Sequence, residues 1–314
     1  MWKSLNNEKF GLMNGVSDFV SKLEFDRSIS LPNLTKTEKI YIFSDYGGEH
    51  KNSDFISYAF LITDWQSVSS SIYEYNNFKR AFNLGNRIIS YKKLNDNLRF
   101  RALSSFLSFS DNINGIIVIF LIQKEISSIF EGDLPDKSSI DFSVWKSDDF
   151  EKLMRIIHLI SLFINGLTRP MQDVCWITDQ DNIVVNDQKL ISVTQMFGNI
   201  SSHYLSHNLR KLQCGRANIE KNNYFEVFCS IPDLIAGGAT ELLTYYTENN
   251  IFPNNKIIVP SSKTTKSKVN TIIGWFMNNH SNLKKLCISL TKGDTTLYKI
   301  THLKFHNLHN YLEL

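Results

Sequence analysis

Short apolar runs along the chain predict the strands of a β-sheet. Each run is rich in β-branched and aromatic residues and is bounded by turn-forming residues, which is typical of strands. The run at 115–122 has no polar side chain, and this predicts a central strand with both faces covered. The runs at 39–44 and 55–63 flank a polar turn and predict a β-hairpin. Further strands are expected at 87–92, 174–178, 209–219 and 224–229, with a terminal hairpin at 286–290 and 296–304.

Between these runs, apolar residues recur every three or four positions and predict helices. The helices are expected at 8–23, around Phe78, and at 97–109, 149–166, 188–205, 233–248 and 269–278. Pro232 opens the helix at 233–248, a position that tolerates its missing N–H. A hairpin followed by alternating helices and strands predicts an α/β fold around a mixed sheet.

The same pattern suggests three parts of the chain. Residues 1–36 are expected to form a helical lead-in, and residues 37–250 the main domain. Residues 251–314 are expected to form a basic extension, a helix and a hairpin packed on the same domain.

Composition is that of a folded protein outside the membrane. Hydrophobic residues make up 42% of the chain and charged residues 21%, which suits a sizeable core and excludes a disordered chain. The longest apolar run is far shorter than the ~20 residues that span a bilayer, and no apolar segment near the start resembles a secretion signal. Four scattered cysteines indicate reduced thiols. We therefore expect a cytoplasmic protein without a membrane partner.

Positive charge gathers near the end of the chain. Residues 256–306 hold nine lysines and a single acid, Asp294, although the net charge of the whole chain is only +3. A basic segment beside a more acidic body suits a surface that meets a polyanion such as DNA or RNA. The other interpretation is that these lysines only solubilise a peripheral hairpin.

Three aspartates stand where strands end or a helix begins. Asp45 ends the first strand, Asp179 follows the strand at 174–178, and Asp233 lies in the first turn of a helix. Strand ends in an open sheet border a crevice where ligands bind. The three carboxylates can therefore meet there and hold Mg²⁺ or Mn²⁺ for phosphodiester hydrolysis. Each aspartate also has a structural alternative, as a turn residue, an Asx turn or a partner of the helix dipole.

Four stretches carry a resemblance to a known family. They are YIFSDYGG (41–48), RIISYKKLNDNLRFRALSSFL (87–107), WITDQD (176–181) and SIPDLIAGGATE (230–241). In this order the sequence resembles the DUF3800 family, bacterial proteins of ribonuclease H-like fold and mostly unknown function. The resemblance implies a ribonuclease H-like mixed β-sheet flanked by helices over residues 37–250, followed by the C-terminal helix-hairpin extension.

The resemblance also implies a nuclease-like metal site formed by Asp45, Asp179 and Asp233, with a fourth acid near the helix after the third strand. Asp96 is the candidate, and its alternative role is an N-cap of helix 97–109. The first motif reads Asp-Tyr-Gly-Gly where the family has Asp-Glu-Ser-Gly, so the adjacent acid is missing. Four other acids are open candidates for the site: Glu49, Glu74, Asp181 and Glu241.

The expected function is divalent-metal-dependent hydrolysis of nucleic-acid phosphodiester bonds, in bacterial defence or mobile-element biology. Lys92 and Lys93 are expected to contact phosphate beside the acids, and Lys263, Lys266 and Lys268 to hold the phosphate backbone from the basic segment. The alternative is a catalytically silent scaffold of the same fold that recruits a protein or nucleic-acid partner. The missing acid of the first motif favours this alternative.

Overall fold

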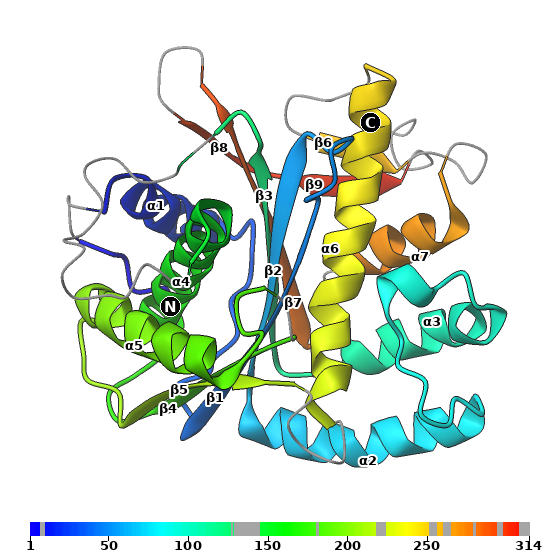
Figure 1. The fold of residues 1–314 in the computed structure, drawn as a ribbon, viewed down its shortest axis with the longest axis horizontal. Helices are drawn as coiled ribbons and strands as arrows, with labels where there is room; N and C mark the ends of the chain where they lie inside the picture. The colour runs from blue at the N-terminus through cyan, green and yellow to red at the C-terminus, as the bar shows by residue number, and fades with distance from the viewer. Residues whose placement is uncertain are drawn as a thin grey trace.

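The computed structural model shows a mixed β-sheet between two layers of helices (Figure 1). The sheet has seven strands in the order β5-β4-β1-β2-β3-β7-β8. Its strands are β1 (Lys39–Gly47), β2 (Phe55–Asp64), β3 (Gly115–Gln123), β4 (Asp173–Thr178), β5 (Lys211–Arg216), β7 (Leu283–Lys292) and β8 (Tyr298–His302). The structure describes residues 1–6, 10–126, 128, 145–179, 182–217, 224–250, 256–259, 265–278, 281–293 and 298–307.

The sheet contains both parallel and antiparallel pairs of strands. Strand β2 runs antiparallel to both of its neighbours, β1 and β3. Strand β4 lies parallel to β1 and β5 parallel to β4, whereas β7 lies parallel to β3 on the other side. A small parallel sheet joins β6 (Lys256–Val259) to β9 (Lys304–Asn307). The predicted α/β class, mixed sheet and first hairpin are confirmed.

Helices cover both faces of the sheet because successive strand residues point to opposite sides. On β1, Ile40 and Ile42 join the apolar cluster of α1, α4 and α5, whereas Tyr41 and Phe43 join that of α2, α3, α6 and α7. Figure 1 shows α4 and α5 on one side of the sheet and α6 on the other. The helices are α1 (Gly11–Phe25), α2 (Trp65–Ala81), α3 (Asn97–Ser110), α4 (Ser147–Leu167), α5 (Asp187–Tyr204), α6 (Tyr224–Glu248) and α7 (Ser267–Phe276).

The 25-residue helix α6 packs directly on β1 and β2. Among the described residues it is the one helix that is long and apolar enough to cross a membrane, and 78% of its apolar window is buried inside the structure. Such burial is typical of a helix in the hydrophobic core. It also means that one side of α6 packs against β1, the strand that carries Asp45.

The predicted strand at 224–229 is wrong, because these residues form the first turns of α6. A short apolar run does not distinguish a buried strand from a buried helix. Pro232 consequently lies inside the helix, where a proline costs about 3 kcal/mol. Burial of the flanking residues against the sheet offsets that cost.

The predicted strand at 87–92 is also wrong. The segment ends in a 3-10 turn at Tyr91–Lys93, and no strand of the sheet pairs with it. Its polar backbone groups bond elsewhere: the Tyr91 N–H donates to Asp233 on α6, and Arg99 donates to the Ile88 carbonyl. The segment therefore belongs to the surroundings of α6 rather than to the sheet.

The chain after residue 250 enters the main sheet. Strand β7 pairs with β3 from Gly115↔Leu283 to Ile122↔Leu290. Strand β8 returns antiparallel to β7, so the predicted terminal hairpin is confirmed. Helix α7 packs against α3 and α6. The basic segment thus supplies two strands to the sheet that carries the aspartates.

Candidate functional site

The three predicted aspartates line one cleft at the carboxyl ends of β1 and β4. Ser44 and Thr178 are partners in these parallel strands, so the next residues, Asp45 and Asp179, lie at the same edge. Asp233 comes from α6, which packs on β1. This cleft, called the acid cleft below, has a volume of about 470 Å³, and all three aspartates line it.

Asp45 and Asp233 are half-buried, and the two side chains interact electrostatically with each other. Burial, together with the nearby charges of Asp233 and Asp179, raises the pKa of Asp45 well above its usual range. Burial also raises the pKa of Asp233, although the hydrogen bond from the Tyr91 N–H (2.6 Å) opposes this rise. Two neighbouring carboxylates resist joint ionisation, and this acts together with burial to raise the pKa of Asp45.

Lys92 and Lys93 lie beside these acids. Both side chains are exposed in the 3-10 turn, and both residues line the acid cleft. The charge of Lys92 opposes the rise in the pKa of Asp233, and that of Lys93 acts in the same way on Glu226. The cleft therefore places two lysines next to carboxylates. This arrangement suits a phosphate that is held to the carboxylates through a metal ion.

Glu226 is a fourth acid of this cleft, and the sequence analysis missed it. Glu226, Ser230 and Asp233 all line the cleft from α6, because spacings of four and three residues place side chains on one helix face. Burial and the charge of Asp179 raise the pKa of Glu226. The seven-residue spacing from Asp233 could have identified it, but a strand at 224–229 removes that periodicity.

Asp96 lies away from the acids, at the start of α3. Its carboxylate accepts a hydrogen bond from the Leu98 N–H (2.8 Å) and pairs with Arg99 and Arg87. These bonds lower the pKa of Asp96, with the Leu98 N–H as the largest cause. Asp96 is not among the residues that line the acid cleft. The structure therefore shows Asp96 as the N-cap of α3.

Lys266 and Lys268 lie near Glu241 rather than beside the acid cluster. Their ammonium groups are 2.9 Å and 3.9 Å from the Glu241 carboxylate. The Tyr91 hydroxyl donates to the same carboxylate (2.5 Å). Burial raises the pKa of Glu241, but the bonds from Tyr91 and Lys266 outweigh it and bring the pKa below its usual value. A neighbouring cleft of about 550 Å³ contains Glu241 and Lys266 and shares Asp233 with the acid cleft.

The other candidate acids divide into three cases. Glu49 lines the acid cleft, where its carboxylate lies 2.7 Å from the Lys152 ammonium. Glu74 is exposed on α2 and does not line the cleft. Asp181 lies outside the described residues, as does Lys263 of the basic segment.

The cleft suits a hard divalent cation, since Asp45, Asp179, Asp233 and Glu226 all offer oxygen ligands. Oε2 of Glu226 is buried and has no hydrogen-bond partner among the described residues. In this conformation no three His, Cys, Asp or Glu side chains of the described residues lie close enough to hold a metal ion. Metal ligands bind in deprotonated form, so the raised pKa values of Asp45 and Asp233 oppose metal binding in this conformation.

Comparison with known proteins adds no family to this description. A scan against protein-family models finds no match for the chain, and a search of the curated proteins finds none either. The chemistry of the cleft therefore rests on its own residues: five acids and three lysines, with the pKa of Asp45 raised well above its usual range.

Gly237 lets the Tyr91 ring lie directly on α6. A Cβ at Gly237 would lie 2.3 Å from the ring carbons. We predict that Gly237→Ala lowers the free energy of unfolding by about 1–3 kcal/mol, although alanine is the better helix former by about 1 kcal/mol. Gly198 on α5 has open space around it, so Gly198→Ala should be stabilising. Urea denaturation measures both, and equal shifts would contradict the packing argument.

Asp96 and Glu226 should respond differently to neutralisation. Asp96→Ala removes an N-cap and should lower the melting temperature by roughly 2–4 °C without changing Mn²⁺ affinity. Glu226→Gln should leave the melting temperature unchanged or higher, because burial already disfavours its charge, and should weaken Mn²⁺ binding. Thermal melts and calorimetric titration test the pair. Weaker metal binding by Asp96→Ala would move the site toward α3.

Proposed function

We propose that this chain is a divalent-metal-dependent nuclease of ribonuclease H-like fold that hydrolyses nucleic-acid phosphodiester bonds. The observation that carries the proposal is the convergence of Asp45, Asp179, Asp233 and Glu226 from two strands and one helix on a single cleft. Lys92 and Lys93 at the same cleft provide charge for a phosphate. Four free cysteines favour a reducing, cytoplasmic setting.

The strand order supports the fold assignment. Five strands run in the order β5-β4-β1-β2-β3, with β1, β2 and β3 antiparallel and β4 and β5 parallel to β1. This is the arrangement expected of a ribonuclease H-like sheet, and α6 follows it as the late helix that carries an acid. Helices α2 and α3 are then an insertion between β2 and β3, and β7 and β8 extend the sheet beyond β3.

The residues of the cleft divide the work of hydrolysis among them. Asp45, Asp179, Asp233 and Glu226 would hold Mg²⁺ or Mn²⁺, which supplies a water of lowered pKa and stabilises charge on the leaving oxygen. Asp45 and Asp233 would hold the cation as deprotonated carboxylates. The Tyr91 N–H keeps Asp233 oriented through its 2.6 Å bond. Lys92 and Lys93 attract and orient the phosphate from the rim.

Calorimetric titration with Mn²⁺ tests the shared site. The native chain should bind Mn²⁺, and Asp179→Asn and Asp233→Asn should each remove that binding while thermal melting is preserved. Asp18→Asn, on the exposed side of α1, is the matched control and should bind like the native chain. Fluorescent single- and double-stranded DNA and RNA are then incubated with Mn²⁺. Binding without cleavage of any of the four would reject the nuclease proposal.

A catalytically silent scaffold is the second candidate. The observation that favours it is the raised pKa of Asp45, because burial and the nearby Asp233 disfavour the charged form that a metal ion requires. Tyr46 also occupies the position next to Asp45, and its hydroxyl bonds to Ser44 (2.7 Å) rather than offering a carboxylate. A folded native chain that binds no Mn²⁺ in the presence or absence of oligonucleotide would favour this function.

A further inference from the structure

The first half of β7 is an edge of the main sheet. Strand β7 pairs with β3 along Leu283–Leu290 on one side, but β8 pairs with it only from Ile288 to Lys292. The last contact on that side is the Leu303 N–H, which donates to the Cys287 carbonyl (3.0 Å). The chain then turns away into β9, which pairs with β6. Among the described residues, no strand pairs with Leu283–Cys287 on the β8 side.

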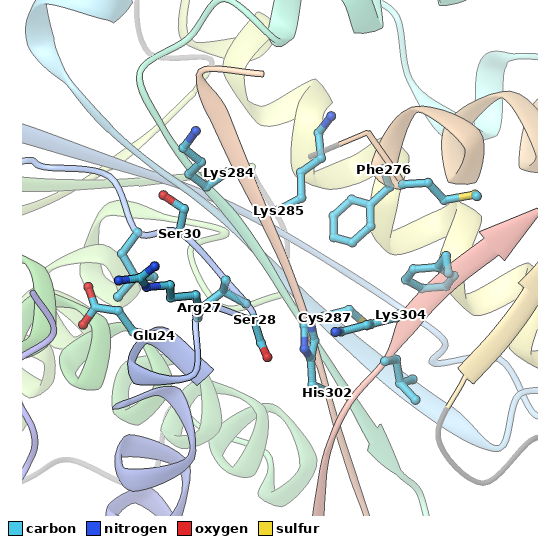
Figure 2. Close-up of a pocket in the computed structure, with 15 residues that line it drawn as sticks. Glu24, Arg27, Ser28, Ser30, Phe276, Lys284, Lys285, Cys287, His302 and Lys304 are labelled. Atoms are coloured by element: carbon cyan, nitrogen blue, oxygen red, sulfur yellow. The ribbon is translucent and has the colours of Figure 1, made fainter. Parts of the chain in front are cut away.

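A cleft of about 730 Å³ lies along this edge. Figure 2 shows Arg27, Ser30 and Lys284 on one side of β7 and Phe276, Lys285 and Lys304 on the other. One wall is the extended segment at 28–31 that follows α1, and the other is the start of β9. The cleft shares no lining residue with the acid cleft. An unpaired strand edge thus forms the floor of a walled groove.

The groove carries positive charge that no nearby acid neutralises. Arg27, Lys284 and Lys304 form no ion pair with any described residue, and Arg27 and Lys304 are exposed. The acid that lines the groove, Glu24, accepts the Trp2 N–H (2.7 Å) and pairs with the N-terminal amine. Lys285 is fully buried and bonded to Asp111, so it adds no exposed charge.

His302 adds no charge to the groove either. Burial and the neighbouring Lys304 lower the pKa of His302 to about 4, so its ring is neutral near pH 7. Arg27, Lys284 and Lys304 therefore give the groove its positive charge. A ligand that matches it offers backbone donors and acceptors along a line, with carboxylates on both sides.

We propose that this groove binds an extended acidic segment of a partner protein, which adds to β7 as a further strand. Main-chain hydrogen bonds to the groups of Leu283–Cys287 other than the Cys287 carbonyl and the Leu283 N–H, which already have partners, supply the attachment, as in other cases of strand addition to a sheet edge. Because side chains alternate across a strand, carboxylates of one parity meet Arg27 and Lys284, and those of the other parity meet Lys304. This inference is independent of the nuclease proposal.

The competing interpretation is that these lysines only prevent edge-to-edge association. Proteins often place lysine on exposed edges for that purpose. Protection of an edge requires charge alone, however, whereas here the edge lies in a groove with the 28–31 segment as a wall. The two interpretations differ in a measurable way, because a merely protected edge selects no peptide.

A peptide-display selection on the full chain tests the proposal. Random nine-residue peptides are selected on the native protein and counter-selected on the triple variant Arg27→Glu/Lys284→Glu/Lys304→Glu. Thermal melting checks that this variant is folded. If it is not, the single variant Lys304→Glu replaces it. Enriched peptides are expected to alternate acidic and β-branched residues. In anisotropy titrations, N-methylation of alternate residues should weaken binding about tenfold in one register and leave the other unchanged.

Three results would overturn the proposal. The first is no enrichment beyond that on the variant, which would leave edge protection as the role of the lysines. The second is equal loss of affinity for both N-methylated registers, which excludes strand pairing. The third is single-stranded DNA that binds the groove as tightly as the peptides and responds equally to the triple substitution, which would make the groove a phosphate-binding surface.

Discussion

Replacing Asp45 with asparagine should abolish Mn²⁺ binding and, at pH 8 without metal, raise the melting temperature. Asparagine keeps the shape of the side chain and removes a charge that burial and Asp233 make unfavourable. Under the proposed function, hydrolysis falls by about 10²- to 10³-fold. Loss of function combined with a gain in stability is characteristic of functional groups held under strain.

The gain in stability should depend on pH in a defined direction. The pKa of Asp45 in the folded chain lies well above the unfolded value of 3.8, so the folded state keeps a proton that the unfolded chain releases. Between these two pKa values the free energy of unfolding decreases as the pH rises. The Asp45→Asn variant lacks this dependence. Its advantage in melting temperature should therefore be small at pH 5 and larger at pH 8.

Comparison of the two proteins cancels the titrating groups that do not interact with Asp45, whereas the contribution of Asp233, whose pKa depends on Asp45, belongs to the measured difference. Asp173 and Glu241 have lowered pKa values, which act on stability in the opposite direction, but they are present in both proteins. Asp18→Asn serves as a control that should follow the native curve at both pH values. Parallel melting curves for native and Asp45→Asn chains, with Mn²⁺ binding retained, would remove Asp45 from the site.

The sequence permitted prediction of the acids at strand ends because their position depends on local signals. An apolar run followed by an acid places that acid at a sheet edge, and the parallel pairing of β1 and β4 then brings Asp45 and Asp179 together. Asp233 joined the prediction through its place near Pro232, although the helix begins eight residues before that proline. The predicted meeting of the aspartates did not depend on where α6 begins, because α6 packs on β1 and carries Asp233.

Glu226 and the position of the basic segment could not be predicted in this way. Glu226 required knowing that 224–229 continues into α6, and an apolar run of six residues does not decide between helix and strand. The partner of Lys266 depended on a long-range contact, since Glu241 meets it only after α6 and α7 pack together. Charge counts along a sequence reveal a basic segment but not which of its lysines already have acidic partners.

Replacing Lys285 with methionine should destabilise the whole protein by about 3–5 kcal/mol. The Lys285 side chain is fully buried, and its ammonium donates to Asp111 (2.7 Å) and to the carbonyls of Trp275 and Asn278 (2.9 Å each). Asp111 also accepts from the Trp275 indole (2.8 Å). Methionine fills the space but leaves the Asp111 carboxylate without its cation and removes one donor from each of two carbonyls.

This cluster joins β7, α7 and the turn before β3, so its loss should be felt by the entire sheet rather than by a peripheral extension. Urea denaturation followed by both tryptophan fluorescence and far-ultraviolet circular dichroism should show one transition, shifted to lower urea. Lys284→Met is the matched control, because among the described residues its ammonium bonds only to the Ser281 carbonyl (2.9 Å), and it should change stability by less than about 1 kcal/mol. Adding Asp111→Asn to Lys285→Met should recover part of the loss by removing the stranded charge. Two separate transitions, or an unchanged midpoint for Lys285→Met, would show instead that residues 251–314 fold as an appendage whose attachment the central sheet does not need.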